Sequence, residues 1–529
     1  MSAKLTLFFT AISRWMDGSL FFRGFTAILN FFKRLCGGSF IARAFVADQA
    51  GLDNSIQRSY FAALINAVLN KIPKPITAPM YWPGALSKLC RGSWFINSLC
   101  ENLDTPIPAA GSRQQVGFGV KAFFQWAFFA APVIGMAGIV LATPFLPTMM
   151  LGALLVPILL LLLLSRRFVV DGATVFIFIF IIISMAVAVV ISFTPRQSIQ
   201  IAVLTALFML AAPAIGAAAA GRKSVDFFIL ILVASAAFTG LVGVYQVLVG
   251  YASSDAYLDA TLFADIRFRV VSTFANANVY ATYLLVLIPI AAACIVFFKH
   301  WFLKLCALGA TGLLLGNLML TYTRGAYVAL PLAIVVFILL IEKRLLILMV
   351  AFVPALPLVL PPTIMGRLLS IVNFSESSTM FRMAIWQGSI RMARDFWATG
   401  VGQGLEAYHT VYPYYALSGA GTLHSHNLFL QTLVEVGVVG LLLLIAIVAC
   451  FFRAQANFFR RATEFRLKVM SAAFMSAMVA FLAQSMFDHS FFNYRILLTF
   501  YLFVGLGIAF TRAYQPPQPT PQLDKERAA

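Results

Sequence analysis

The stretch Ala173–Phe193, which reads ATVFIFIFIIISMAVAVVISF, carries no charged residue and is long enough to cross a bilayer as a helix. Similar apolar runs follow one another from residue 122 to residue 511. The whole chain is 61% hydrophobic and only 11% charged, and a soluble domain has no means of burying so much apolar surface. The sequence therefore predicts an all-α, polytopic membrane protein with about twelve transmembrane helices.

The apolar runs divide the chain into predicted parts. The runs lie at about 122–142, 148–164, 173–193, 198–220, 227–248, 277–298, 305–321, 326–341, 345–364, 428–452, 469–487 and 496–511. The resulting parts are a basic amphipathic, cytoplasmic or interfacial region at 1–121, a transmembrane bundle at 122–364, a large outer loop containing short helices at 365–427, further transmembrane helices at 428–511 and a disordered cytoplasmic tail at 512–529.

The net charge of +19 has two possible meanings, nucleic-acid binding or the positive charge of cytoplasmic membrane loops. The basic residues are scattered between apolar runs without interleaved aromatic residues, so we exclude nucleic acid as a partner. If there are twelve helices, the loops that contain basic residues all fall on one side of the membrane. These residues are Arg166-Arg167, Arg222-Lys223, Lys299 with Lys304, Lys343-Arg344, and the group from Arg453 to Lys468. This pattern predicts a multi-pass protein with both termini in the cytoplasm. In a bacterial cell the membrane would be the plasma (inner) membrane.

The predicted outer face carries arginines against the usual charge bias. Arg269 precedes the sixth run, Arg324 follows the seventh, and Arg382 lies in the large loop. The planar guanidinium group suits phosphate because it donates two parallel hydrogen bonds. Snorkelling, or ion pairs with Asp265, Asp395 and Glu406, is the alternative for any single arginine.

Two of the five histidines lie in the loop Thr422-Leu423-His424-Ser425-His426-Asn427, directly before an apolar run. Ionisable groups at the mouth of a transmembrane helix are costly and are therefore candidates for function. A histidine here suits a general base or a substrate-binding group. A structural role and a metal site are the alternatives, although no third metal ligand is evident nearby. Asn427, Gln431 and Glu435 recur every four residues and so share one helix face.

The large outer loop contains a predicted helix near 379–397, opened by Ser and Thr capping signals. Arg382 and Trp386 lie four residues apart and share a face of it. The segment from Gly400 to Gly404 is glycine-rich, but it is no nucleotide-binding fingerprint because it follows a helix rather than a strand.

Taken in order, these motifs resemble the O-antigen ligase and O-antigen polymerase superfamily over about residues 260–445. The motifs are Arg269, Phe274-Ala275-Asn276-Ala277-Asn278, Thr323-Arg324-Gly325-Ala326, Arg382 with Trp386, Gly400-Val401-Gly402, His426-Asn427, Glu435 and Gly437. Ala277 departs from the family pattern, which commonly has proline between the two asparagines.

The resemblance implies an inverting, metal-independent glycosyltransferase without a cofactor, acting in lipopolysaccharide or other envelope polysaccharide synthesis. It would move a glycan from undecaprenyl pyrophosphate to an acceptor hydroxyl, such as one on a lipid A-core or another glycan, at the outer face. By this resemblance His426 is the catalytic base, with His424 as its substitute, and Arg269 and Arg382 bind the diphosphate, with Arg324 as a third. The implied supporting residues are His424, Asn427, Gln431, Glu435, Asn276, Asn278 and Trp386.

Alternatives within the enzyme class are a polysaccharide polymerase and a protein O-oligosaccharyltransferase, since the donor chemistry is the same. A transporter or flippase is a more distant alternative, which predicts paired charges near the middle of the bilayer. The region 1–121 is a possible docking module for envelope-assembly proteins, and membrane lipids are expected to surround the rest.

Overall fold

The computed structural model describes residues 118–164, 171–251, 268–372, 377–417 and 421–515. Nearly all of the predicted basic region at 1–121, and most of the tail at 512–529, therefore lie outside the described residues. Within the described ranges the secondary structure is helical and contains no strand, which confirms the predicted all-α class.

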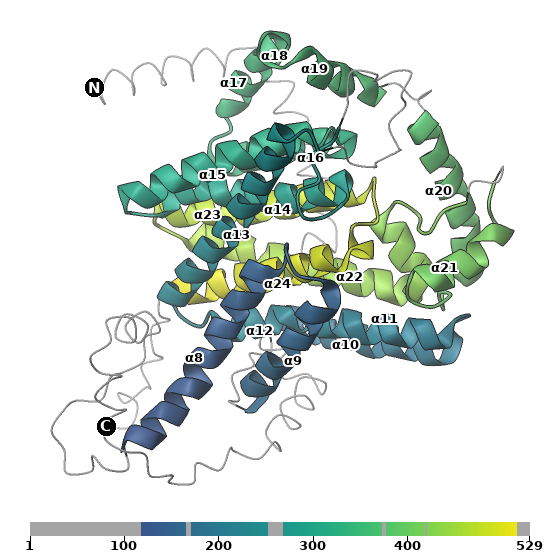
Figure 1. The fold of residues 1–529 in the computed structure, drawn as a ribbon, viewed down its shortest axis with the longest axis horizontal. Coiled ribbons are helices and arrows are strands. Elements are labelled where there is room, and N and C mark those ends of the chain that lie inside the picture. The colour runs from purple at the N-terminus through teal and green to yellow at the C-terminus, as the bar shows by residue number, and fades with distance from the viewer. Residues whose placement is uncertain (1–117, 165–170, 252–267, 373–376, 418–420, 516–529) are drawn as a thin grey trace, which may run out of the picture.

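The described chain forms a succession of helices, most of them packed side by side (Figure 1). In chain order they are α8 Phe118–Ala142, α9 Thr148–Leu164, α10 Gly172–Ala186, η1 Val187–Ile191, α11 Pro195–Met209, α12 Ala211–Ala218, α13 Arg222–Leu248, α14 Ala277–Phe297, α15 Trp301–Leu320, α16 Arg324–Ile341, α17 Leu345–Phe352, η2 Val353–Ala355, α18 Leu356–Val359, α19 Pro362–Leu369, η3 Ser370–Val372, α20 Ser377–Phe396, α21 Leu405–Val411, η4 Tyr412–Tyr414, α22 Leu428–Arg461, α23 Phe465–Ser485, η5 Ser490–Phe492 and α24 Tyr494–Tyr514.

Nine helical segments of the described chain are long and apolar enough to cross a membrane, which confirms a polytopic membrane protein. The three other predicted runs correspond to shorter apolar segments, Ala130–Ala142, Thr148–Leu163 and Leu345–Ala355. The run at 345–364 is not one continuous helix, since α17, η2, α18 and α19 succeed one another through it. Prolines 354, 357, 361 and 362 explain the breaks, because proline lacks an amide hydrogen and clashes with the preceding turn. The total of twelve stays a prediction.

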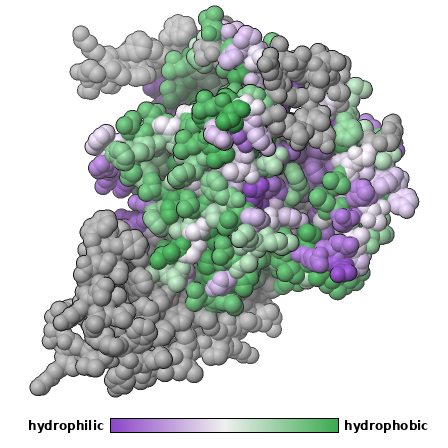
Figure 2. Space-filling view, in the orientation of Figure 1, coloured by the Kyte–Doolittle hydropathy of each residue, from purple (hydrophilic) through white to green (hydrophobic). Residues whose placement is uncertain are grey.

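The core of the bundle is formed by α14, α23 and α24, whose most apolar windows are 78%, 72% and 83% buried. The outer helices α15 and α16 are 28% buried and expose aliphatic side chains. On the face shown in Figure 2, hydrophobic residues cover most of the helices, while hydrophilic residues gather toward the edge where α20 and α21 lie. This distribution is expected of helices in lipid with one polar end.

A break in α22 shapes the polar end of the bundle. Gly437 has φ 77° and ψ −177°, a conformation that is open essentially to glycine alone. The break leaves backbone carbonyls of α22 without a partner in the helix, and amides of the segment after α20 donate to them. The Val401 amide donates to the Val434 carbonyl (2.9 Å) and the Gly402 amide to the Glu435 carbonyl (3.2 Å). Gly400, at φ 71°, has no space for a Cβ beside the Glu435 carbonyl. The glycines of the Gly400–Gly404 segment thus join the loop predicted to lie outside to α22.

Replacing Gly437 with alanine is expected to destabilise the protein by about 1–3 kcal/mol, because alanine is strained in this conformation and its Cβ meets the backbone of Ala398. Thermal unfolding in lipid nanodiscs, followed by tryptophan fluorescence, measures the change. Gly312→Ala in α15 is the matched control, since nothing lies within 4 Å of a Cβ built there. An equal loss of stability in both variants would contradict the proposed strain.

Candidate functional site

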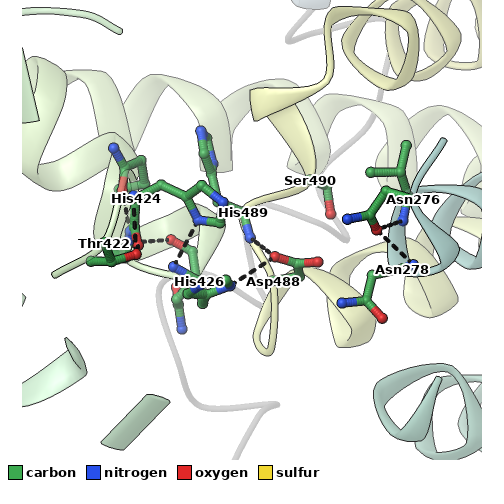
Figure 3. Close-up of polar contacts among 12 residues, drawn as sticks. Asn276, Asn278, Thr422, His424, His426, Asp488, His489 and Ser490 are labelled. Carbon is green, nitrogen blue, oxygen red and sulfur yellow. Dashed lines mark hydrogen bonds and ion pairs between the residues drawn. The ribbon is translucent and has the colours of Figure 1, made fainter. Parts of the chain in front are cut away.

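Two loops meet at the polar end of the bundle. The first, residues 421–427, precedes α22, and the second, residues 486–493, connects α23 to α24. The Asn427 side chain ties them together, because its amide donates to the Met486 carbonyl (3.0 Å). Figure 3 shows His424 and His426 of the first loop beside Asp488 and His489 of the second. We call these four side chains the histidine cluster.

The cluster is held by close contacts between its members. His426 Nδ1 lies 3.3 Å from Asp488 Oδ1, and the same carboxylate oxygen accepts a hydrogen bond from the His489 amide (2.9 Å). The His424 and His426 rings are 4.2 Å apart between centroids. His426 adopts φ 50°, a left-handed conformation that costs energy for a residue with a side chain and is typical of functional sites.

Burial differs among the members of the cluster and sets their charge. The His426 side chain is 24% exposed, whereas that of Asp488 is 6% exposed. Burial lowers the pKa of His424 to about 4, with the charges of His426 and Arg382 acting in the same direction. Burial also lowers the pKa of His489, so both imidazoles are neutral near pH 7.

Asp488 remains ionised although it is buried. Burial alone would raise the pKa of its carboxyl group, but the hydrogen bond with His426 and the charges of His426, His424 and Arg382 hold the pKa well below its usual range. A buried carboxylate beside an exposed imidazole fixes the orientation of the ring. His426 is therefore the member of the cluster that is both accessible and equipped to take up a proton.

The first turns of α22 support the histidine loop. Asn427 is the N-cap of α22 and accepts from the Leu430 amide (3.0 Å). Gln431 accepts from the Ser425 amide (2.7 Å) and donates to Glu435 (2.8 Å). The predicted polar face of Asn427, Gln431 and Glu435 thus exists, and it anchors the loop that carries His426.

Glu435 and His489 also line a cavity of about 50 Å³ below the loops, together with Gln403, Thr432 and Tyr494. This volume is enough for a few water molecules, and the lining offers them polar partners. The His489 Nδ1 atom is buried without a hydrogen-bond partner in the described residues.

Arg382 approaches the cluster from α20, which spans Ser377–Phe396 and confirms the helix predicted near 379–397. Its charge acts on both His424 and Asp488, and its side chain is half-buried. Trp386, one turn further along, is half-buried with its indole nitrogen lacking a partner among the described residues. Arg391 lies on the opposite side of α20 and is exposed.

The other two predicted arginines lie at the turn Thr321–Arg324, which connects α15 to α16. Arg269 is buried, and its guanidinium donates to the Thr321 carbonyl (2.7 Å), Asn278 (2.9 Å) and Thr323 (3.1 Å). Arg324 donates to Ser378 (2.5 Å), at the start of the helix that carries Arg382. The turn therefore connects Arg269 with α20.

Asn276 and Asn278 have different structural roles. Asn276 caps α14 by accepting from the amides of Asn278 (2.8 Å) and Val279 (3.2 Å), whereas Asn278 receives the hydrogen bond from Arg269. The loop before α14 is further held by Arg495, which donates to the Thr273 carbonyl (2.9 Å) and stacks over Phe274. Ala277 is accommodated as the first residue of α14.

Sequence reasoning missed three residues of this region: Asp488, His489 and Arg367, the last of which donates to the Tyr322 carbonyl (3.3 Å). A signal for the first two was present, because Asp488-His489 stands at the mouth of the eleventh predicted run just as His424–Asn427 stands at the mouth of the tenth. The sequence did not predict that the two loops lie close together, since His426 and Asp488 are 62 residues apart. Arg367 had no such signal.

Comparison with known proteins points to the same part of the chain. No curated protein matches the sequence. A family model described as O-antigen ligase matches residues 309–445, a segment that contains Arg324, Arg382, His424 and His426 but neither Arg269 nor Asp488. Over residues 309–445 the chain is therefore similar to the O-antigen ligase family, which supports the resemblance that the motifs of the sequence predicted.

Proposed function

We propose that the protein transfers a glycan from undecaprenyl pyrophosphate to an acceptor hydroxyl at the outer face of the bacterial plasma membrane. The observation that carries the proposal is the histidine cluster itself: an accessible imidazole, His426, paired with a buried carboxylate, Asp488, within the electrostatic reach of Arg382. This arrangement combines a base for the acceptor with a positive charge for a diphosphate.

The reaction needs no metal or cofactor in this proposal. The acceptor hydroxyl gives its proton to His426 while its oxygen bonds to the anomeric carbon. The bond between that carbon and the diphosphate oxygen breaks, and its electron pair leaves with the diphosphate. Attack from the side opposite the leaving group inverts the anomeric configuration. Arg382 and Arg324 stabilise the negative charge that develops on the diphosphate.

The remaining site residues position these groups. The Arg269 guanidinium donates to the Thr321–Arg324 turn and to Asn278. We therefore propose that Arg269 holds Arg324 beside α20, in addition to binding the diphosphate. Asn427 and Gln431 fix the histidine loop, and Glu435 fixes Gln431. Trp386 shares the helix and face of Arg382 and offers an aromatic surface for a sugar.

The decisive experiment is reconstitution of the full chain in nanodiscs with an undecaprenyl-pyrophosphate glycan in the presence of EDTA. Transfer to a lipid A-core acceptor indicates a ligase, extension of the donor glycan indicates a polymerase, and glycosylation of a protein indicates an O-oligosaccharyltransferase. An inverted product linkage is expected in each case. Failure of all three acceptors with a donor that binds, or a product with retained configuration, would refute the proposed reaction.

Replacing Asp488 with asparagine is expected to lower the turnover number about 10–100-fold, the range typical for loss of a carboxylate that orients a histidine in a metal site. Asparagine keeps the shape but removes the charge that stabilises the protonated imidazole. The KM for the donor is expected to stay unchanged, because Asp488 is buried beneath His426 and does not contact the donor. Steady-state kinetics separate the two constants.

Asp488→Glu is the conservative partner of that variant, and it is expected to recover part of the turnover because it restores the charge. If the asparagine variant instead raises KM without lowering turnover, or if glutamate is no better than asparagine, Asp488 has no orienting role.

A further inference from the structure

The histidine cluster has a second chemical property besides basicity. His424, His426 and Asp488 each offer one ligand atom, and these atoms all lie within 4.8 Å of one another. His426 Nδ1 and Asp488 Oδ1 are already 3.3 Å apart. Two ligands of a tetrahedral zinc ion, bound at 2.0–2.1 Å, are separated by about 3.3 Å. The ligand atom of His424 lies within 4.8 Å of both, so all three donors surround one point.

The donor set also matches the chemistry of zinc. Two imidazoles and one carboxylate, with a fourth position open, form the ligand set of many zinc sites, whereas calcium and magnesium prefer oxygen ligands alone. The His489 amide donates to Asp488 (2.9 Å), so the carboxylate is held in place. Because His426 is 24% exposed, an ion can reach the site from the polar end of the bundle.

We propose that His424, His426 and Asp488 bind a zinc ion, and that this ion inhibits the protein. The inhibitory part rests on the proposed function: zinc bound to His426 occupies the ring nitrogen that faces Asp488 and removes the base. The positive ion also adds a charge next to Arg382. Binding itself requires only the three side chains and is independent of the reaction.

Binding is tested with untagged, metal-free full-length protein in nanodiscs, titrated with Co²⁺ as a spectroscopic probe for the zinc site. One equivalent is expected to produce intense visible absorption bands of a four- or five-coordinate ion, and Zn²⁺ is expected to abolish them. The variants His424→Gln and Asp488→Asn should each weaken Co²⁺ binding at least tenfold. His409→Gln is the matched control, because His409 is an exposed histidine on α21. Equal binding by all four proteins would overturn the site.

Inhibition is tested in the transfer assay. Zn²⁺ is expected to stop transfer by the wild type and by His409→Gln, EDTA to restore it, and His424→Gln to raise the half-inhibitory concentration at least tenfold. Zinc that binds without inhibiting, or activity that requires zinc, would overturn the inhibitory role. The two proposals fail separately: transfer without Co²⁺ binding removes only the zinc site, and Co²⁺ binding without any transfer removes the proposed reaction and its inhibition but leaves the zinc site.

Discussion

Replacing His426 with alanine is expected to lower glycan transfer by about 10²–10⁴-fold, the usual contribution of a general base. A neutral acceptor hydroxyl is a weak nucleophile, and His426 is the accessible imidazole that a buried carboxylate orients. Donor binding is expected to persist, because the imidazole acts on the acceptor. Initial rates with a fluorescent lipid-linked glycan, together with donor binding in nanodiscs, measure both effects.

His409→Ala on α21 is the control for this variant, since it removes an exposed histidine that lies outside the cluster. Its transfer rate is expected to match the wild type. His424→Ala separates the two histidines of the loop: the buried His424 packs against Phe492 and its Nδ1 accepts from the His426 amide, so a smaller loss is expected. Wild-type rates in His426→Ala, with rates lost in His424→Ala, would transfer the role of base to His424.

Much of the fold was predictable because lipid imposes simple rules. Runs such as Ala173–Phe193 must form helices, since an unpaired backbone has no partner in hydrocarbon, and Gly172–Ile191 does. The run at 345–364 shows where this reasoning ends. Its composition is that of a transmembrane helix, but its prolines divide it into short pieces, so hydropathy and helix continuity are separate questions.

The site was predictable in its parts but not in its assembly. His426 and Arg382 were found from charge in an apolar chain, and Gln431 and Glu435 from helical spacing. Asp488 was not found, because its importance lies in its contact with His426, 62 residues earlier. Local sequence rules identify polar residues whose placement beside a membrane helix costs free energy. Which loops pair depends instead on how α22 and α23 pack.

Arg269 was found from the sequence, but its surroundings in the structure were not. A positive charge at the predicted outer face suggested a phosphate ligand, and in the structure that charge lies inside the protein among three hydrogen bonds. Its contact with a diphosphate stays a prediction. The hydrogen bonds indicate that its loss would displace the Thr321–Arg324 turn, so an inactive Arg269 variant alone does not distinguish binding from positioning.

Arg382 allows a cleaner test, and Arg382→Ala is expected to lower transfer by about 10²–10³-fold, as loss of one group that stabilises transition-state charge does. The leaving diphosphate gains negative charge as the glycosidic bond breaks, and Arg382 is the half-buried cation whose charge reaches Asp488 and His424. The expected loss is mainly in turnover, because the interaction strengthens as charge develops. Single-turnover rates at saturating donor measure it.

The helix itself supplies the control. Arg391 lies nine residues further along α20, on the opposite side, and is exposed, so Arg391→Ala removes the same charge from the same element without approaching the cluster. If the two variants lose activity equally, the effect comes from the net charge of the loop. Arg382→Lys should recover only part of the rate, since lysine restores the charge but not the planar pair of donors. Full recovery would mean that charge alone acts, whereas partial recovery requires the two parallel hydrogen bonds that a diphosphate oxygen pair accepts.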